Sequence, residues 1–214
     1  MKQQLNRLME NKVNLYGASG HCKVIVDTLI SSGVAIDTIV DDNPKSELLL
    51  GIEIKRTENF NWNATSPWIL SIGNNLTRKR ISEKLKIEFT KAIHKTAIIS
   101  NYSSIKEGTV VMAGVIINPD VTIGKHCIIN SGAIIEHDCE IADFVHISPN
   151  ASLAGNVKIG EGTHVGIGTS IIPGITIGKW VTIGAGAVII KDIPDYAVVV
   201  GNPGKIIKYN KQND

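Results

Sequence analysis

Residues 116–141 read IINPDVTIGKHCIINSGAIIEHDCEI, and an aliphatic side chain recurs there at every sixth position. The spacing continues in both directions and fills sixteen successive positions without a break: Ile99, Ile105, Val111, Ile117, Ile123, Ile129, Ile135, Ile141, Ile147, Leu153, Ile159, Val165, Ile171, Ile177, Ile183 and Ile189. An α-helix repeats about every 3.6 residues and a β-strand about every 2, so neither element alone explains a period of six. A short strand followed by a tight turn does explain it.

Two further positions of the hexad support this interpretation. The residue two places before the aliphatic one is small or β-branched, and it includes Cys127 and Cys139, which we therefore expect to point into a core. The residue after the aliphatic one is often Gly or Asn, and we expect it to supply the left-handed corner conformation. Hexapeptide repeats of this kind build a parallel β-helix.

The chain before the repeat alternates strand-like and helix-like patterns. After a polar lead over residues 1–12, it predicts strands near 13–16, 35–40, 52–54, 67–72 and 89–93, and helices near 22–32 and 76–85. In the first helix Val24, Ile25, Thr28 and Leu29 are expected to share a buried face. Such alternation indicates a small parallel α/β sheet with three helices and four or five strands.

The loop after the first strand carries the pattern Gly17-x-x-Gly20, and the acidic pair Asp41-Asp42 follows about 24 residues later. Backbone N–H groups at a helix start face phosphate in nucleotide sites, and a carboxylate faces the ribose or base. The alternative is a glycine turn that only reverses the chain. The sequence therefore predicts a nucleotide site at this loop.

Composition excludes several classes of partner. The net charge is +2, from 22 basic and 20 acidic residues, which gives no electrostatic case for nucleic acid or an anionic membrane. No apolar run reaches 18 residues and the amino terminus has no apolar h-region, so we expect a cytoplasmic protein. Three cysteines without pair spacing predict no metal site.

Several motifs together resemble one family. They are Gly-Ala-Ser-Gly-His at 17–21, Asp41-Asp42, Ile-Gly-Asn-Asn at 72–75 with Arg78-Lys79, Ile-Glu-His-Asp-Cys at 135–139, Ala-Gly-Asn-Val at 154–157 and Gly-Asn-Pro-Gly-Lys at 201–205. Over about residues 13–208 they resemble the hexapeptide-repeat sugar acetyltransferases, which include sialic acid O-acetyltransferases and the N-acetyltransferases of nucleotide-linked 4-amino-4,6-dideoxy sugars. The resemblance is closest to the UDP-4-amino-sugar N-acetyltransferases.

The resemblance implies a fold and an assembly. It implies an α/β, Rossmann-like domain over residues 1–93 that binds the nucleotide sugar, a left-handed, three-sided β-helix over 94–196 with about eighteen residues per coil, and a C-terminal cap over 197–214. It also implies a homotrimer that binds acetyl-CoA as co-substrate. One departure is Cys22, which stands where many relatives have glycine, and it bears on the shape of the phosphate site.

Acetyl transfer requires a base for the nucleophile's proton and donors for the tetrahedral oxyanion. His137 is the best candidate base, because it lies near a predicted corner between Glu136 and Asp138, either of which could fix its tautomer. The family's base falls on His137 and its orienting acid on Asp138, with Asn130 as a supporting polar contact. The alternative interpretations are a surface histidine at a turn and a turn asparagine.

Spacing adds a geometric prediction. His146 and His164 are eighteen residues apart and should stack in adjacent coils, whereas His137 is half a coil from His146 and should point away from it. His137 of one subunit would then meet His146 of a neighbour in a trimer. The alternative is that His146 and His164 are ordinary exposed β-helix residues.

Binding roles follow from the resemblance. The implied acetyl-CoA contacts are His146, Gly155 as oxyanion donor, Ile167, Gly168 and Ala185. The implied nucleotide-sugar contacts are Ser19, Gly20, His21, Asp41, Asp42, Gly73 and Arg78, with Arg78 as the phosphate partner.

These observations predict a homotrimeric, acetyl-CoA-dependent N-acetyltransferase that acts on the 4-amino group of a UDP-linked 4-amino-4,6-dideoxy sugar, without a metal or an acyl-enzyme. Alternatives are a GDP-linked amino sugar or a sialic acid hydroxyl as acceptor. A metal-dependent β-helix enzyme with His137, His146 and His164 as ligands, and a non-enzymatic scaffold, are more remote alternatives.

Overall fold

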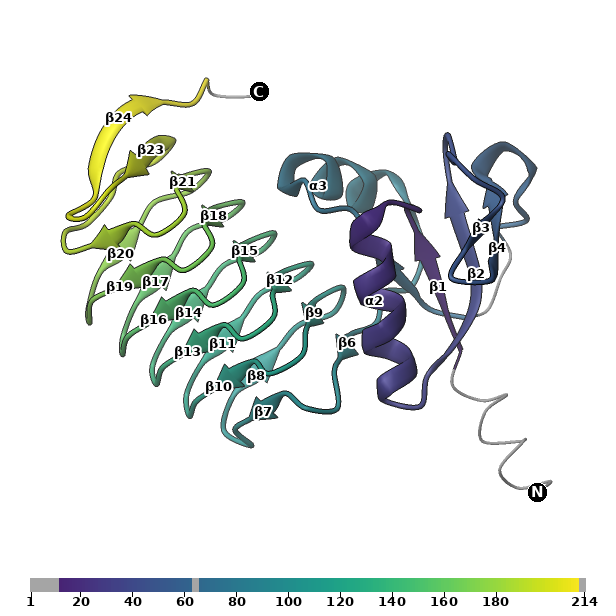
Figure 1. Cartoon of the computed structure of the whole chain (residues 1–214), viewed down its shortest axis with the longest axis horizontal. Coiled ribbons are helices and arrows are strands. Elements are labelled where there is room, and N and C mark those ends of the chain that lie inside the picture. The colour runs from purple at the N-terminus through teal and green to yellow at the C-terminus, as the bar shows by residue number, and fades with distance from the viewer. Residues whose placement is uncertain (1–11, 63–65, 212–214) are drawn as a thin grey trace.

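The computed structural model describes residues 12–62 and 66–211. The chain forms an α/β domain followed by a long parallel β-helix, and the α/β domain lies against the side of the first coils (Figure 1). Except for Lys12, the polar lead predicted over residues 1–12 lies outside the described residues. No helix within the described ranges is long and apolar enough to cross a membrane.

The α/β domain contains one five-stranded sheet in the order β3-β4-β2-β1-β5, in which only β3 runs antiparallel to its neighbour. Its strands are β1 (Lys12–Tyr16), β2 (Ala35–Asp41), β3 (Leu48–Leu49), β4 (Ile52–Arg56) and β5 (Trp68–Leu70). Because β1, β2 and β5 are parallel, the loops that follow them meet at one edge of the sheet. That edge brings together the glycine loop, the acidic pair and the loop before the second helix.

Two α-helices accompany the sheet among the described residues, α2 (Gly20–Ser31) and α3 (Asn75–Lys84), together with the short 3₁₀ turn η1 (Thr57–Asn59). Three helices were predicted. Helix α2 buries Cys22, Ile25, Val26, Thr28 and Leu29 against the sheet. Val24 was predicted on the same face, but it is 40% exposed.

The β-helix has three faces, because strands eighteen residues apart pair in parallel, as Ile116 does with Ile134. The first face contains β7 (Ile98–Ile99), β10 (Ile116–Ile117), β13 (Ile134–Ile135), β16 (Ser152–Leu153), β19 (Ser170–Ile171) and β22 (Val188–Ile189). The second contains β8 (Ser104–Ile105), β11 (Thr122–Ile123), β14 (Glu140–Ile141), β17 (Lys158–Ile159) and β20 (Thr176–Ile177). The third contains β6 (Ala92–Ile93), β9 (Val110–Val111), β12 (Ile128–Ile129), β15 (His146–Ile147), β18 (His164–Val165), β21 (Thr182–Ile183), β23 (Ala197–Val200) and β24 (Lys205–Tyr209).

The periodic aliphatic residues form the core of the prism, as predicted. All of them from Val111 to Ile189 are buried, and Ile99 and Ile105 at the open end are partly buried. Cys127 and Cys139 are fully buried in the same core. The hexad spacing therefore reports which side chain points inward.

The corners follow a different rule from the predicted one. Left-handed residues recur three places after the aliphatic residue, at Gly108, Gly114, Asp120, His126, Gly132, Asp138, Phe144, Asn150, Asn156, Gly162, Gly168, Gly174, Trp180 and Gly186. The glycine directly after the aliphatic residue has no positive φ. It is small for another reason: a Cβ on Gly160 would lie 2.6 Å from the backbone carbon of Gly178 in the next coil. The prediction that this position supplies the left-handed corner is therefore wrong.

The C-terminal segment begins as a further strand of the third face. Strand β23 pairs in parallel with β21, and β24 then turns back antiparallel to β23. The Asn210 side chain donates to the Trp180 carbonyl and to Thr182 Oγ1, both at 3.2 Å. These bonds attach the end of the chain to the last coils.

Candidate active site

The third face carries a row of polar side chains beside the α/β domain. The imidazole of His146 stacks on that of His164, with ring centroids 4.8 Å apart and an interplanar angle of 2°. The Asn130 side-chain amide donates to His146 Nε2 at 3.1 Å, and Ser148 Oγ lies 2.8 Å from His164 Nε2. The predicted stacking of the two histidines is confirmed.

His21, in the first turn of α2, faces this row from the α/β domain, and its ring centroid lies 6.4 Å from that of His146. Burial lowers the pKa of His21 to about 4. Burial, followed by repulsion from His164, lowers the pKa of His146 to about 3. Both imidazoles are therefore neutral near pH 7, and they can give and accept hydrogen bonds without carrying charge.

His137 lies elsewhere, at the corner between the first and second faces. Its Nδ1 is 2.7 Å from Asp138 Oδ2, and 62% of its side chain is exposed. The Asp138 hydrogen bond, with a smaller Coulombic contribution from Glu136, raises the pKa of the His137 imidazole above its usual range. Because Asp138 receives the Nδ1 proton, the lone pair on Nε2 is free to accept another.

The His137 ring rests on the backbone of the next coil. A Cβ on Gly155 would lie 2.6 Å from His137 Cε1, so only glycine leaves room for the imidazole in this position. The Gly155 N–H has no hydrogen-bond partner among the described residues. An imidazole and an unused backbone donor are therefore adjacent at one corner.

Asn130, the predicted supporting polar contact, and the predicted acetyl-CoA contacts Ile167, Gly168 and Ala185 lie at a different corner. All four are in turns between the third and first faces. Asn130 contacts His146 rather than His137 within the chain. As spacing predicted, His137 and His146 are on different sides of the prism, and one chain alone does not bring them together.

The carboxyl edge of the α/β sheet holds a cavity of about 570 Å³ lined by Ser19, Gly20 and Asp41. Asp41 accepts the Ala18 N–H at 2.7 Å and the Asn43 N–H at 2.8 Å. Its carboxylate therefore orders the glycine loop and its own turn.

Asp42 lines a separate cavity of about 580 Å³. Its Oδ1 accepts the Tyr16 hydroxyl at 2.7 Å and the Thr57 hydroxyl at 2.9 Å. The two members of the acidic pair thus face different cavities.

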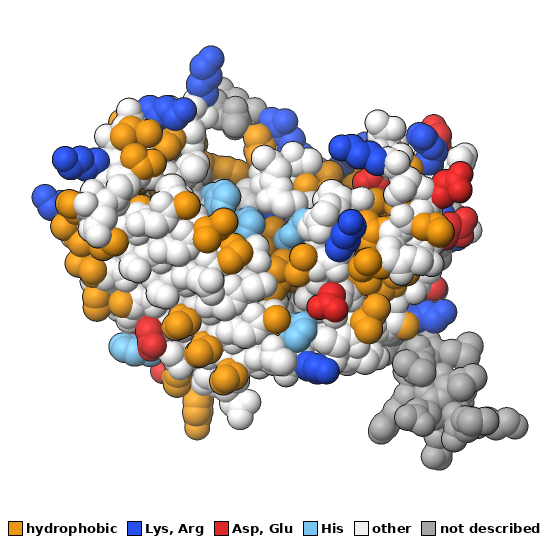
Figure 2. Space-filling model, in the orientation of Figure 1, with side chains coloured by type: hydrophobic (Ala, Val, Ile, Leu, Met, Phe, Trp, Pro, Cys, Tyr) orange, Lys and Arg blue, Asp and Glu red, His pale blue; other side chains and the backbone are white. Residues whose placement is uncertain are grey.

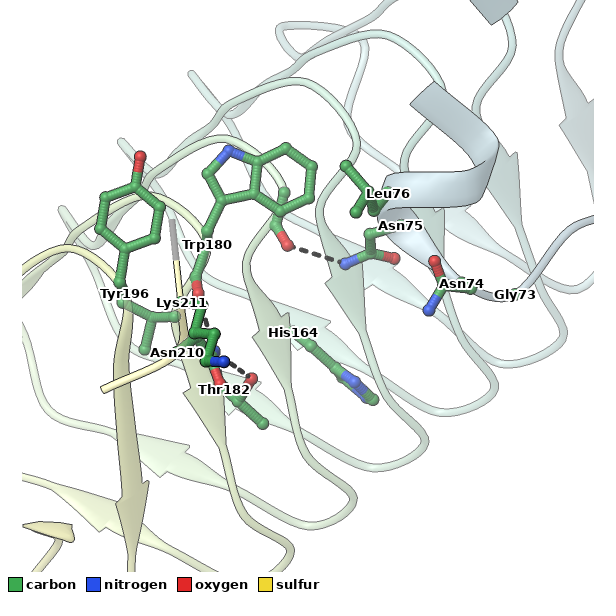
Figure 3. A pocket seen from close by; sticks show the side chains of 12 residues that line it. Gly73, Asn74, Asn75, Leu76, His164, Trp180, Thr182, Tyr196, Asn210 and Lys211 are labelled. Atoms are coloured by element: carbon green, nitrogen blue, oxygen red, sulfur yellow. Dashed lines mark hydrogen bonds between the residues drawn. The ribbon is translucent and has the colours of Figure 1, made fainter. Parts of the chain in front are cut away.

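A third cavity, of about 320 Å³, lies between the start of α3 and the third face (Figure 3). Gly73 and Asn74 line it from the α/β domain, and His164, Trp180 and Thr182 line it from the β-helix. Asn75 donates to the Gly162 carbonyl at 3.0 Å and joins its two walls. Asn75 therefore helps to hold the two domains together, a role that its sequence pattern did not reveal, whereas Asn74 caps α3 by accepting the Thr77 N–H.

The predicted phosphate partner, Arg78, is not available to a phosphate. Its side chain is 1% exposed. Its N–H groups donate to five acceptors from both domains: the carbonyl oxygens of Ile72, Gly73, His126 and Phe144, and Asn75 Oδ1. The predicted role of Arg78 is therefore corrected: the guanidinium connects the two domains.

The described residues contain no group of three or more His, Cys, Asp or Glu side chains placed to hold a metal ion. His146 and His164 stack face to face, and their Nε2 atoms contact Asn130 and Ser148. The three histidines of the metal-site alternative do not converge within one chain.

Two family models match the chain. The PglD N-terminal domain matches residues 12–85, and the bacterial transferase hexapeptide model matches 102–137, 120–155 and 156–191. The structure of perosamine N-acetyltransferase from Caulobacter crescentus, in complex with CoA and GDP-perosamine, superimposes with a TM-score of 0.88 at 34% identity, and covers 92% of this chain and 97% of that one.

The chain belongs to the hexapeptide-repeat sugar acetyltransferases. Another member of this family is the acetyltransferase domain of PglB from Neisseria gonorrhoeae in complex with acetyl coenzyme A, with 34% identity, 92% and 99% coverage and a TM-score of 0.85. A curated relative is UDP-N-acetylbacillosamine N-acetyltransferase from Bacillus subtilis, 42% identical over 110 residues. That match spans 47% of this chain and 51% of the relative. The predicted family and fold class are confirmed.

Proposed function

We propose that this sugar acetyltransferase transfers the acetyl group of acetyl-CoA to the 4-amino group of a UDP-linked 4-amino-4,6-dideoxy sugar, with His137 as the general base. The observation that carries the proposal is the arrangement of His137, Asp138 and Gly155 at one corner of the prism. Relatives of known structure bind CoA with GDP-perosamine, or bind acetyl coenzyme A, which supports the co-substrate and the class of acceptor.

The chemistry follows from the positions of the protons. The acceptor amine attacks the thioester carbonyl carbon, and His137 Nε2 takes the proton that the amine loses. The Asp138 carboxylate holds Nδ1–H and stabilises the imidazolium that forms. The Gly155 N–H would donate to the oxyanion; the C–S bond then breaks, and the His137 imidazolium returns its proton to the CoA sulfur, so that CoA leaves as its thiol. Transfer is direct, so no acyl-enzyme forms.

The proposed active site requires a second copy of the chain. The outward side chains of the first face are mostly apolar, and Ile98 among them is 67% exposed. Those of the second face are polar or charged: Ser104, Thr122, Glu140, Lys158 and Thr176. Hydrophobic side chains also gather along the edge of the β-helix farthest from the α/β domain (Figure 2). The first face therefore has the character of a subunit interface.

Threefold packing on the first face has a direct geometric consequence. A triangular prism that turns one face toward the axis meets each neighbour at the two corners that flank this face. His137 lies at one of these corners, and Asn130 and Ile167 lie at the other; Ile167 is 57% exposed. His137 of one subunit would thus approach the acetyl-CoA contacts and His146 of the next subunit. The α/β domain of that next subunit, which faces His146, would hold the nucleotide sugar.

UDP is proposed over GDP from the hydrogen bonds of Asp42. Its Oδ1 already accepts from Tyr16 and Thr57, whereas no described residue donates to Oδ2. One free carboxylate oxygen matches the single ring N–H of uracil, whereas guanine offers a ring N–H and an adjacent amino group as a pair. The Bacillus relative is named for a UDP-linked sugar and the Caulobacter relative binds a GDP-linked one, so both belong in the test.

The test is a panel of UDP- and GDP-linked 4-amino sugars and sialic acid, each incubated with acetyl-CoA while release of free thiol is followed. The proposal expects turnover with a UDP-linked amino sugar, which is lost in His137→Ala while acetyl-CoA still binds. Near-normal kcat in His137→Ala would reject the assigned base, and preference for a GDP sugar or sialic acid would reject the assigned acceptor. Failure of the wild type to bind acetyl-CoA would favour a non-enzymatic role.

A further inference from the structure

Because Arg78 is buried between the two domains, no cationic side chain has yet been assigned to the phosphates of the nucleotide sugar. The 570 Å³ cavity at the carboxyl edge of the sheet is also lined by Lys23 and Lys45. Lys23 is the fourth residue of α2, and Lys45 lies in the loop between β2 and β3, so the two reach the cavity from separate segments. Both side chains are exposed, and neither forms an ion pair with a residue in the described ranges.

The position of Lys23 is electrostatically unfavourable unless an anion is bound. The first turn of α2 contains no acidic residue, and the N-cap residue Ser19 makes no side-chain capping bond. The N–H groups of Gly20 and His21 likewise have no partner among the described residues. A helix start is already positive, so a lysine there raises the local positive potential further and destabilises the free helix. An anion in the cavity would reverse that effect.

The one acidic side chain among the residues that line this cavity does not oppose an anion strongly. Both oxygens of Asp41 already accept backbone N–H groups, from Ala18 and Asn43. Its charge is therefore compensated by the loop, and Lys23 and Lys45 remain uncompensated cations in the cavity. Two lysines and two free backbone donors match the oxygens of a diphosphate, which is the anionic part of a nucleotide sugar.

We propose that Lys23 and Lys45 bind the diphosphate of the nucleotide sugar, together with the first turn of α2. This inference rests on the proposed function and assigns the phosphate contact within it. The phosphates would lie away from the reacting amine, so these contacts contribute equally to the ground state and the transition state. Their loss raises KM for the nucleotide sugar and leaves kcat unchanged.

The test measures UDP and uridine binding by calorimetry in wild type, Lys23→Gln, Lys45→Gln and the double variant. Lys55→Gln is the matched control, because Lys55 is an exposed lysine on β4 of the same domain and lines none of the three cavities described above. Each single variant should weaken UDP binding by about tenfold, and uridine binding should not change. Added salt should weaken UDP binding by the wild type more than by the double variant. Without ligand, Lys23→Gln should melt at the same temperature as wild type or higher.

UDP affinity of the double variant within twofold of wild type would overturn the lysine assignment. A double variant that turns over normally with an unchanged KM for the nucleotide sugar would also overturn the lysine assignment. Neither result would contradict the proposed function. Failure of the wild type to bind UDP would instead overturn the proposed acceptor and the lysine assignment with it. An equal loss of UDP and uridine binding would show that the substitutions damage the whole domain and would also reject the phosphate role.

Discussion

Replacement of Arg78 by methionine tests whether this residue connects the domains or binds substrate. The substitution leaves the buried acceptors His126 O, Phe144 O and Asn75 Oδ1 without a donor, at a cost of about 2 kcal/mol each. Water can reach the partly buried carbonyls of Ile72 and Gly73. Burial lowers the pKa of Arg78 to about 10, so removal of the buried charge recovers about 3 kcal/mol. The net loss of stability is therefore about 3 kcal/mol.

For a chain of 214 residues, a loss of this size lowers Tm by about 6 to 12 °C. Thermal unfolding followed by circular dichroism at fixed protein concentration measures it. Arg80→Met is the matched control, because Arg80 is exposed on the same helix, and its effect should stay within about 0.5 kcal/mol. An Arg78→Met variant that melts with wild type but shows a raised KM for the nucleotide sugar would refute the structural role.

Three further expectations concern individual side chains. Asp138→Asn should move the midpoint of the pH profile of kcat/KM downward, because the Asp138 hydrogen bond raises the pKa of His137. Gly155→Ala should lower kcat by about ten- to a hundredfold with little change in Tm, because the new Cβ displaces the His137 ring. Burial lowers the pKa of His126 to about 4. Between about pH 4 and 6.5 the unfolded chain therefore binds more protons than the folded chain. The free energy of unfolding should fall by up to about 3 kcal/mol as the pH drops through this window. In pH-dependent urea unfolding, His126→Phe should reduce that loss, because a phenyl ring keeps the stacking on Phe144 and takes no proton.

The hexad spacing predicted the interior of the β-helix because inward orientation recurs with the coil. Ile129 and Cys127 are buried for this reason. The spacing did not distinguish the two kinds of small residue at a corner, since a left-handed backbone and a close coil-to-coil contact both favour glycine. Gly168 has a positive φ and open space, whereas Gly160 faces backbone. That distinction depends on the stacking of adjacent coils.

Contacts between the domains could not be predicted from the hexad spacing or from the alternation of strands and helices in the α/β domain. Arg78 lies in a basic helix, where a charged residue is usually exposed, yet its partners at His126 and Phe144 belong to turns of the β-helix. The sequence also placed Asp41 and Asp42 together at one nucleotide site, although neighbouring strand residues point to opposite sides of a sheet. Asp41 and Asp42 therefore reach different cavities.

The pKa values of the histidines explain why His137 suits the proposed base. His21 and His146 are already desolvated in a single chain, which keeps them neutral and makes them poor proton acceptors near pH 7. His137 is exposed and hydrogen-bonded to Asp138, which raises its pKa. In the proposed trimer a neighbouring subunit would cover this corner, and desolvation would then lower the pKa of His137. The Asp138 hydrogen bond and the covering subunit would therefore act on the pKa of His137 in opposite directions in the assembled enzyme.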